Sequence, residues 1–183
     1  MQEVQKGVRG ENLVAATLAK YSNLDAHIIR NFPLRNESDT GYYQIDVVLV
    51  CNRGVFALEV KNWECIVECS PRDIYWKTIY PNREIMVKSP FLQNRVHCTA
   101  LCKLLKTTVS NVVVFSDKTT IRNPFQCVIS CLDIGEYLTD FPVVYQDAQI
   151  QEIVEKLLAY KKEHDEGLFV DFFCKGLLNH NKM

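Results

Sequence analysis

Residues 54–63 read Gly-Val-Phe-Ala-Leu-Glu-Val-Lys-Asn-Trp, and this run has the residue types of a β-strand. Side chains alternate between the two faces of a strand, so Glu59 and Lys61 share one face. The opposite face carries Phe56, Leu58 and Val60. A charged side chain in so apolar a strand is costly unless something pairs with it. The stretch therefore predicts a strand over residues 54–62 with a paired or ligand-binding charge.

A second strand is expected over residues 42–51, and it contains Asp46. The turn at residues 52–53 joins it to the first. If the loop is two residues long, the numbers of facing residues sum to 105, and Asp46 faces Glu59. Directly opposed Cβ atoms are roughly 5 Å apart, and two carboxylates there repel unless they are protonated or bridged by a cation. A longer loop with Gly54 as a bulge would shift the pairing by one residue, and both registers stay open.

A helix is expected over residues 3–20, because apolar side chains recur there at helical spacing. Its apolar stripe contains Val4, Val8, Ala15 and Leu18. Glu11 lies in the same stripe, so its carboxylate would point inward, which is unusual for an acid. The alternative is an acid at the helix end, because Gly7 and Gly10 are poor helix formers and the helix can begin beside Glu11.

The residues resemble the nuclease-related domain (NERD) family, a branch of the PD-(D/E)xK nuclease superfamily. The similarity spans roughly residues 5–130. It runs through Gly7-x-x-Gly10-Glu11, Gln44-Ile45-Asp46, residues 54–63 and, more weakly, Pro90-x-x-Gln93. The 54–63 stretch is the specific part, because Glu-x-Lys alone occurs by chance in many proteins. The resemblance implies an α/β fold with a restriction-endonuclease-like core, in which helices flank a mixed central β-sheet.

The resemblance also implies the site residues. The metal-site acids would be Glu11, Asp46 and Glu59, the family's lysine would be Lys61, and its helix glutamine would be Gln93. The first four are expected on the same side of the sheet. Ser89, Val47 and Cys65 depart from the family's common residues, and none of them is a metal-site residue.

These residues lead to the expectation of a metal-dependent endonuclease that hydrolyses phosphodiester bonds, in DNA rather than RNA. Mg²⁺ or Mn²⁺ would be the cofactor, because hard cations take carboxylate oxygens. Lys61 could orient water or stabilise charge on the phosphate. Gln93 would lie in the first turn of a helix capped by Ser89.

Two alternatives remain at this point. One is a catalytically weak module that binds nucleic acid or protein on the same fold. The other is an internal ion pair between Asp46 and Lys61, which leaves Glu59 uncompensated.

The chain has 183 residues, of which 48% are hydrophobic, and a net charge of −1. We expect one domain over residues 1–183 with a helical C-terminal part from about residue 147. No stretch approaches the roughly 18 apolar residues of a membrane span, and no signal sequence is visible, so a cytoplasmic protein is expected. The near-neutral charge argues against a non-specific nucleic-acid coat protein and leaves room for a protein partner or a homo-oligomer.

Eight cysteines are present, and six of them form pairs four residues apart. The pairs are Cys65 with Cys69, Cys98 with Cys102, and Cys127 with Cys131. A zinc site is one interpretation, but the spacing differs from compact Cys-x₂-Cys knuckles and the pairs lie in apolar runs. Buried free thiols in a reducing compartment are the favoured interpretation.

The remaining elements follow from the same patterns. Strands are expected at 26–32, 65–69, 74–80, 109–115 and 127–131. Helices are expected at 90–106, 133–138 and about 148–163, with a polar loop at 116–123. The apolar tail at 169–173 is expected to pack back or to bind a partner.

Overall fold

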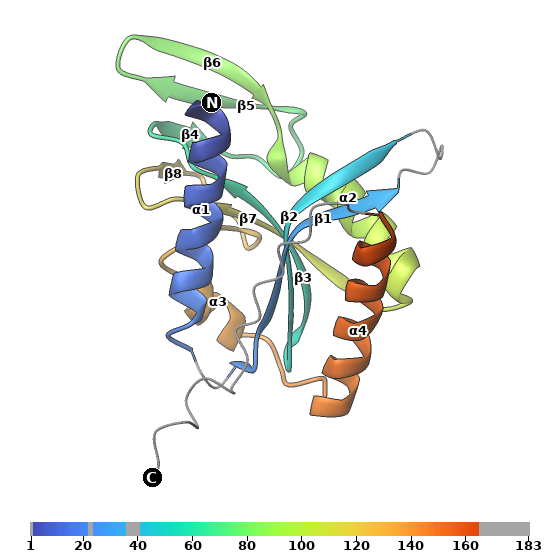
Figure 1. The fold of residues 1–183 in the computed structure, drawn as a ribbon. Coiled ribbons are helices and arrows are strands. Elements are labelled where there is room, and N and C mark those ends of the chain that lie inside the picture. The colour runs from blue at the N-terminus through green and yellow to red at the C-terminus, as the bar shows by residue number, and fades with distance from the viewer. Residues whose placement is uncertain (1, 22–23, 36–40, 165–183) are drawn as a thin grey trace.

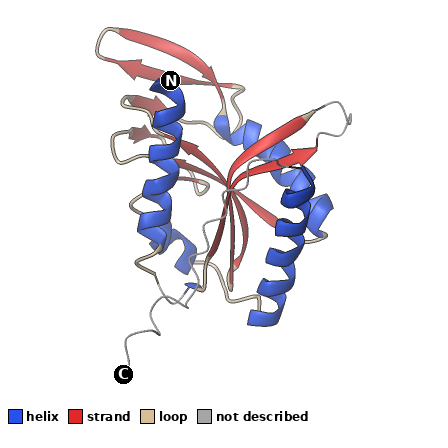
Figure 2. Cartoon of the chain, in the orientation of Figure 1, coloured by secondary structure: helices blue, strands red, loops and turns tan. Residues whose placement is uncertain are grey.

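The protein is described by a computed structural model covering residues 2–21, 24–35 and 41–164, which form two β-sheets with helices packed around them (Figure 1, Figure 2). The elements in chain order are α1 (Gln2–Leu18), β1 (His27–Arg35), β2 (Tyr42–Cys51), β3 (Gly54–Lys61), β4 (Ile66–Glu68), β5 (Tyr75–Tyr80), β6 (Arg83–Lys88), α2 (Pro90–Leu105), β7 (Val109–Phe115), β8 (Thr120–Arg122), β9 (Val128–Ser130), α3 (Ile134–Thr139) and α4 (Asp147–His164).

The central sheet has the strand order β1-β2-β3-β7-β9 and is mixed. The chain forms two antiparallel pairs, β1 with β2 and β2 with β3, before β7 and β9 add in parallel. In the second hairpin the facing pairs run from Val47 with Leu58 to Cys51 with Gly54. The two-residue loop and the register that it predicts are therefore confirmed, but the pairs end at Val47 and Leu58, so the expected facing pair of Asp46 and Glu59 is not among them.

Helices cover both faces of the central sheet, as Figure 1 shows. Apolar side chains of α1 and α3 pack on one face, against Phe56, Leu58 and Val60 of β3. Those of α2 and α4 pack on the other face, against Val55 and Ala57. The expected α/β fold, with a mixed central sheet flanked by helices, is confirmed.

A second sheet with the order β6-β5-β4-β8 lies beside the end of the first, and the sequence patterns missed two of its strands. Residues 120–122 were expected in a polar loop, but they pair in parallel with β4. No element was expected over Arg83–Lys88, which pairs with β5 as a largely exposed edge strand. β8 has only three residues and β6 is largely exposed, so each carries too weak an apolar pattern to stand out without the neighbouring strand with which it pairs.

The other expected helices and strands are found, most of them with shifted ends, whereas β7 has the expected bounds. Ser89 accepts a hydrogen bond from the Leu92 N–H and caps α2, which begins at Pro90 as predicted. The strand expected at 26–32 continues to Arg35. The expectation for residues 169–173 concerns a segment outside the described residues. None of the described helices is long and apolar enough to cross a membrane.

Candidate functional site

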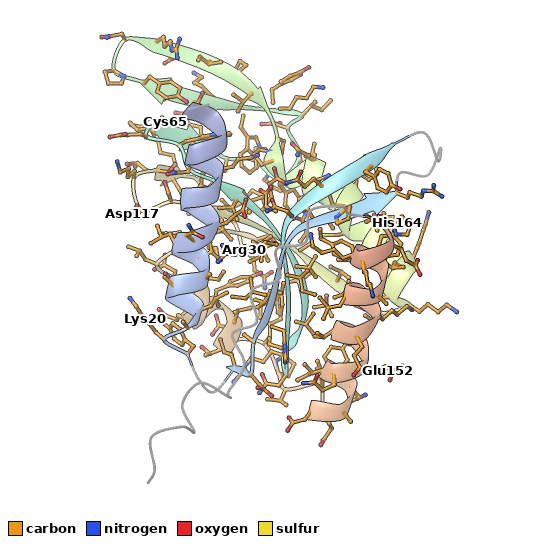
Figure 3. All side chains as sticks on the ribbon, viewed as in Figure 1. Lys20, Arg30, Cys65, Asp117, Glu152 and His164 are labelled. Carbon is orange, nitrogen blue, oxygen red and sulfur yellow. The ribbon has the colours of Figure 1, made fainter. Side chains whose placement is uncertain are left out.

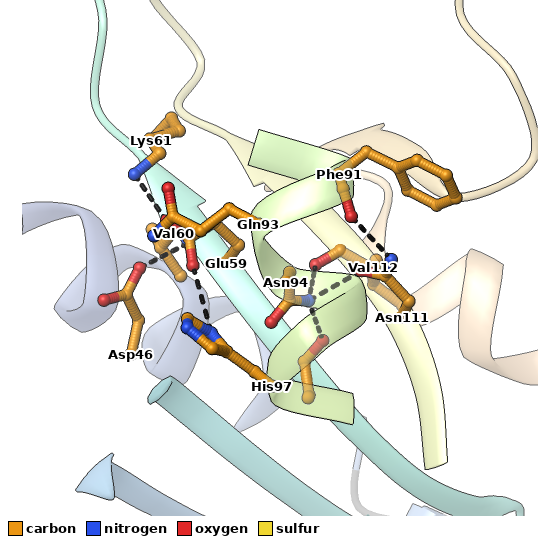
Figure 4. Close-up of polar contacts among 11 residues, drawn as sticks. Asp46, Glu59, Val60, Lys61, Phe91, Gln93, Asn94, His97, Asn111 and Val112 are labelled. Carbon is orange, nitrogen blue, oxygen red and sulfur yellow. Dashed lines mark hydrogen bonds and ion pairs between the residues drawn. The ribbon is translucent and has the colours of Figure 1, made fainter. Parts of the chain in front are cut away.

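Glu59 is the centre of a polar network on the face of the sheet that α2 covers (Figure 4). Its side chain is only 2% exposed, and its Oε1 accepts hydrogen bonds from Lys61 Nζ at 2.5 Å and Gln93 Nε2 at 3.2 Å. The Lys61 side chain is 23% exposed, so the ammonium group lies at the solvent edge of the network. The structure therefore brings together three of the predicted site residues.

Glu59 Oε2 is buried, and within the described residues it has no hydrogen-bond partner. The imidazole of His97 is its neighbour, with Nδ1 at 3.9 Å. Burial lowers the pKa of His97 below its ordinary value of 6.5, although the Asp46 carboxylate opposes this shift. A neutral imidazole gives Oε2 little compensation for its lost water, so this oxygen is available to a ligand.

Sequence reasoning missed His97 and Asn94, and both positions carried a signal. His97 follows Gln93 by four residues and therefore lies on the same helix face. Asn94 is fully buried among the apolar positions of α2, and its Nδ2 donates to Ala57 O at 2.8 Å and to Asn111 Oδ1 at 2.7 Å (Figure 4). These bonds hold α2 against β3, and so they fix Gln93 and His97 over Glu59.

Asp46 lies where β2 separates from β3. Paired residues stop at Val47 and Leu58, and beyond them the Asp46 Oδ2 accepts a hydrogen bond from the Val60 backbone N–H at 2.8 Å. The side chain thus takes the place of a ladder partner. Burial raises the pKa of Asp46 to about 6, and the neighbouring charge of Glu59 adds to the shift.

The first hairpin changes face at this same point. Ile29 and Phe32 of β1 both pack under α2 and α4, although residues three apart in a regular strand face opposite sides. Their partners in β2, Val48 and Ile45, behave in the same way. Between them Asn31 has a φ of 48°, in the left-handed region that Asn tolerates. Asp46 lies opposite Asn31 in the register, at the position where the hairpin changes face. Its side chain therefore does not follow the alternation of the strand on either side.

Glu11 reaches the site from the other side of the sheet. It is 8% exposed and lies one residue after Gly10, where a Cβ would meet Val60 Cγ1 at 3.0 Å. Burial raises the pKa of Glu11 to about 7, with a further contribution from Asp46, whereas Arg30 opposes the shift. Arg30, which is labelled in Figure 3, also donates to Asn12 Oδ1 of α1.

The expectation that all four charged residues share one side of the sheet is therefore wrong for Glu11. α1 packs on the face opposite α2, so its stripe points Glu11 inward from that face. Asp46, where the β2–β3 pairs end, interacts electrostatically both with Glu11 and with Glu59. Among the described residues, no group of three or more His, Cys, Asp or Glu side chains is arranged to hold a metal ion as it stands.

The described cysteines lie mostly in the core. The buried ones are Cys51, Cys65, Cys69, Cys98 and Cys131, whereas Cys102 and Cys127 are half-buried, and all seven are free thiols. Burial raises the pKa of Cys69 and of Cys98 to about 12. These thiols are protonated at neutral pH and pack as small apolar groups, as the sequence predicted.

Comparison with known proteins identifies the family. An uncharacterized protein of Bacillus anthracis is 31% identical over 97 residues, which are 52% of this chain and 45% of that protein. The chain thus spans less than half the length of this relative. No solved structure matches the chain. The nuclease-related domain family matches residues 6–116, which include the five site residues predicted from the sequence. Because this match covers more than half of the 183 residues, the chain belongs to the nuclease-related domain family.

Proposed function

We propose that this protein is a metal-dependent endonuclease that hydrolyses phosphodiester bonds in DNA, with Mg²⁺ or Mn²⁺ held by Glu11, Asp46 and Glu59. Membership of a nuclease-related family supports the reaction class. One observation of the site carries the proposal: the Oε2 of the buried Glu59 has no hydrogen-bond partner among the described residues, beside a second carboxylate, that of Asp46.

The donor set fits a hard divalent cation. All three groups are carboxylates, which Mg²⁺ and Mn²⁺ prefer as ligands. The pKa values of Glu11 and Asp46 are raised by burial and by neighbouring carboxylates. A cation between the three acids would remove that repulsion, and the free energy released would contribute to its binding.

The residues around the acids have distinct parts in the proposed reaction. A bound cation would supply Lewis-acid polarisation of the scissile phosphate. Lys61 Nζ, at the solvent edge, would donate to the attacking water or to a phosphate oxygen, where an ammonium stabilises developing negative charge. Gln93 Nε2 holds Glu59 Oε1, and the Val60 N–H orients Asp46. The choice of DNA over RNA follows from the family resemblance of the sequence.

A second candidate is a catalytically weak module that binds nucleic acid or protein. One observation favours it: Glu59 already has a cationic partner, because Lys61 Nζ lies 2.5 Å from its Oε1. An ion pair of this kind can hold the carboxylate without a metal. In that case Lys61 would serve stability, and no cation would be needed.

The two candidates are separated by metal-dependent stability and cleavage. Purified protein is melted with EDTA, Mg²⁺ or Mn²⁺ and is incubated with circular and linear DNA under the same conditions. We expect millimolar Mn²⁺ to raise the melting temperature, because a ligand at 100 times its Kd stabilises by about 2.7 kcal/mol. We also expect cleavage of circular DNA, which requires an endonuclease.

Asp46→Asn keeps the size of the side chain and an acceptor for the Val60 N–H, but it removes the charge. It should abolish both the thermal shift and cleavage while the protein still melts cooperatively. Asp140→Asn, at an exposed position after α3, is the matched control and should behave as wild type. A wild-type protein that shows neither a Mn²⁺ shift nor cleavage would favour the binding module.

A further inference from the structure

Lys161 of α4 is a buried charge that the proposed reaction does not use. It is 1% exposed, and it lies beyond residues 6–116, the segment that matches the family. Its Nζ donates to the backbone carbonyls of Arg30 at 3.1 Å and of Asn31 at 2.6 Å. Burying an ammonium costs free energy unless hydrogen bonds compensate for the lost water. The groups that Lys161 binds therefore indicate its role.

The two acceptors are informative because they are consecutive. Carbonyl groups alternate in direction along a regular β-strand, so one amine does not normally reach two in succession. Here the chain leaves the extended conformation at Asn31, which has a φ of 48°. The Lys161 ammonium therefore binds the kink itself and stabilises a backbone conformation that an ordinary strand would not adopt.

The kink is coupled to the site through the hairpin. The β1–β2 pairs continue in one register on both sides of it, from Arg30 with Val47 to Phe32 with Ile45, which places Asp46 opposite Asn31. The change of face in β1 is matched by the change of face in β2. A regular β1 would require a regular β2, and Asp46 would then leave the Val60 N–H.

We infer that Lys161 is a positioning residue: its ammonium holds the Arg30–Asn31 kink, and the kink directs Asp46 to the Val60 N–H in the geometry that the site requires. A role of Lys161 in catalysis rests on the proposed function. The structural coupling of Lys161 to Asp46 does not depend on that function. The helix α4 would thus be a structural part of the site, although it lies outside the segment that matches the family.

The first test replaces Lys161 by Met, which has a similar length and no charge. The readout is hydrogen exchange of the Val60 amide without metal, compared with the Val114 amide of β7 as an internal reference. We expect the exchange rate of the Val60 amide, relative to that of Val114, to rise at least about tenfold. An N–H that has lost its hydrogen-bond acceptor is more accessible to water. Lys162→Met, at the exposed neighbouring position of α4, should leave the ratio unchanged. An unchanged ratio in Lys161→Met would overturn the inference.

A second test stays decisive even if Lys161→Met fails to fold. Asn31→Gly and Asn31→Ala both remove the hydrogen bond from Gln44 Nε2 to Asn31 Oδ1, so they differ only in backbone preference. Gly adopts positive φ freely and Ala does not. We expect Asn31→Gly to keep the wild-type Val60 exchange ratio and Asn31→Ala to raise it. Equal ratios in the two variants would contradict the coupling.

The same proteins separate this inference from the proposed function. If the wild type binds Mn²⁺, Asn31→Ala and Lys161→Met should require about tenfold more Mn²⁺ for half of the thermal shift, a change equivalent to about 1.4 kcal/mol. Asn31→Gly and Lys162→Met should match wild type. If the wild type shows no Mn²⁺ shift, the proposed function fails, while the Val60 ratios still decide whether Lys161 positions Asp46.

Discussion

The two halves of the candidate site are built in different ways. The half around Glu59 is closed by hydrogen bonds between β3 and α2, with Gln93 on the carboxylate and Asn94 bonded to Ala57 O. The half around Asp46 and Glu11 lies where two strands part, and it draws on α1 from the opposite face. In the first half the Oε1 of Glu59 is paired, although its Oε2 has no hydrogen-bond partner among the described residues. The second half carries two carboxylates whose pKa values are raised.

The two halves of the site differ in how the charge of their carboxylates is compensated. On the α2 side the charge of Glu59 is matched by Lys61, and the helix is fixed by buried amides. On the α1 side the pKa values of Glu11 and Asp46 are both raised, which is the mark of carboxylates held without enough compensation. Strain of this kind is typical of functional sites, because a ligand can relieve it.

The largest effect is expected for Lys61→Met, which tests whether the half of the site around Glu59 takes part in the reaction. If the ammonium acts on water or phosphate, the cleavage rate should fall by roughly 10²–10⁴-fold, with little change in the Mn²⁺ concentration that stabilises the protein. Rate and melting temperature are measured on one preparation. Lys77→Met, which breaks the exposed Lys77–Glu84 pair of 3.3 Å, is the control. Loss of stability with an unchanged rate would reduce Lys61 to an ion-pair partner.

An intermediate effect is expected for Glu11→Gln, which tests the half of the site around Asp46 and Glu11. The pKa of Glu11 is raised from 4.5 to about 7 in the folded protein, so the folded state binds a proton more tightly than the unfolded state. Stability from this group is complete below about pH 4.5 and is lost as the pH rises towards 7. The loss amounts to up to about 3 kcal/mol at 1.36 kcal/mol per pKa unit.

In EDTA, Glu11→Gln should therefore melt several degrees above wild type at pH 8, and the gap should close towards pH 4.5. Mn²⁺ should reverse the order at pH 8, because it stabilises only the protein that keeps the carboxylate. Thermal melts over a pH series check both statements. Glu152→Gln, at an exposed position of α4, should follow wild type throughout. If the melting temperatures of the variant and the wild type are equal at every pH, the ionised Glu11 carboxylate does not destabilise the folded protein.

The smallest effect concerns the cysteines, none of which is one of the residues compared above. We expect no stoichiometric zinc on metal analysis of the native protein. Thiol reagents should modify the half-buried Cys102 and Cys127 before Cys69 and Cys98, whose burial raises their pKa to about 12. Mass mapping of the labelled sites gives the order. One zinc per chain, lost together with the fold on chelation, would contradict the interpretation as core thiols.

Much of the half around Glu59 could be predicted from the sequence, because the positions of its residues depend on local patterns. Alternation along residues 54–63 places Glu59 and Lys61 on one face, and the turn at residues 52–53 sets the register of the hairpin. Ser89 and Pro90 predict where α2 begins, and so they predict that Gln93 lies in its first turn. Each of these inferences depends on neighbours within a few residues, where periodicity and turn chemistry act directly.

The arrangement of Asp46 and Glu11 was determined by the tertiary structure. The helical stripe of α1 predicts that Glu11 points inward, but only packing determines which face of the sheet receives it. The face change at Asn31 depends on a left-handed backbone and on carbonyls that Lys161 binds from 130 residues away. No pattern within the hairpin encodes that partner. The sequence by itself therefore determined which residues could form the site, and long-range packing determined how Asp46 and Glu11 meet.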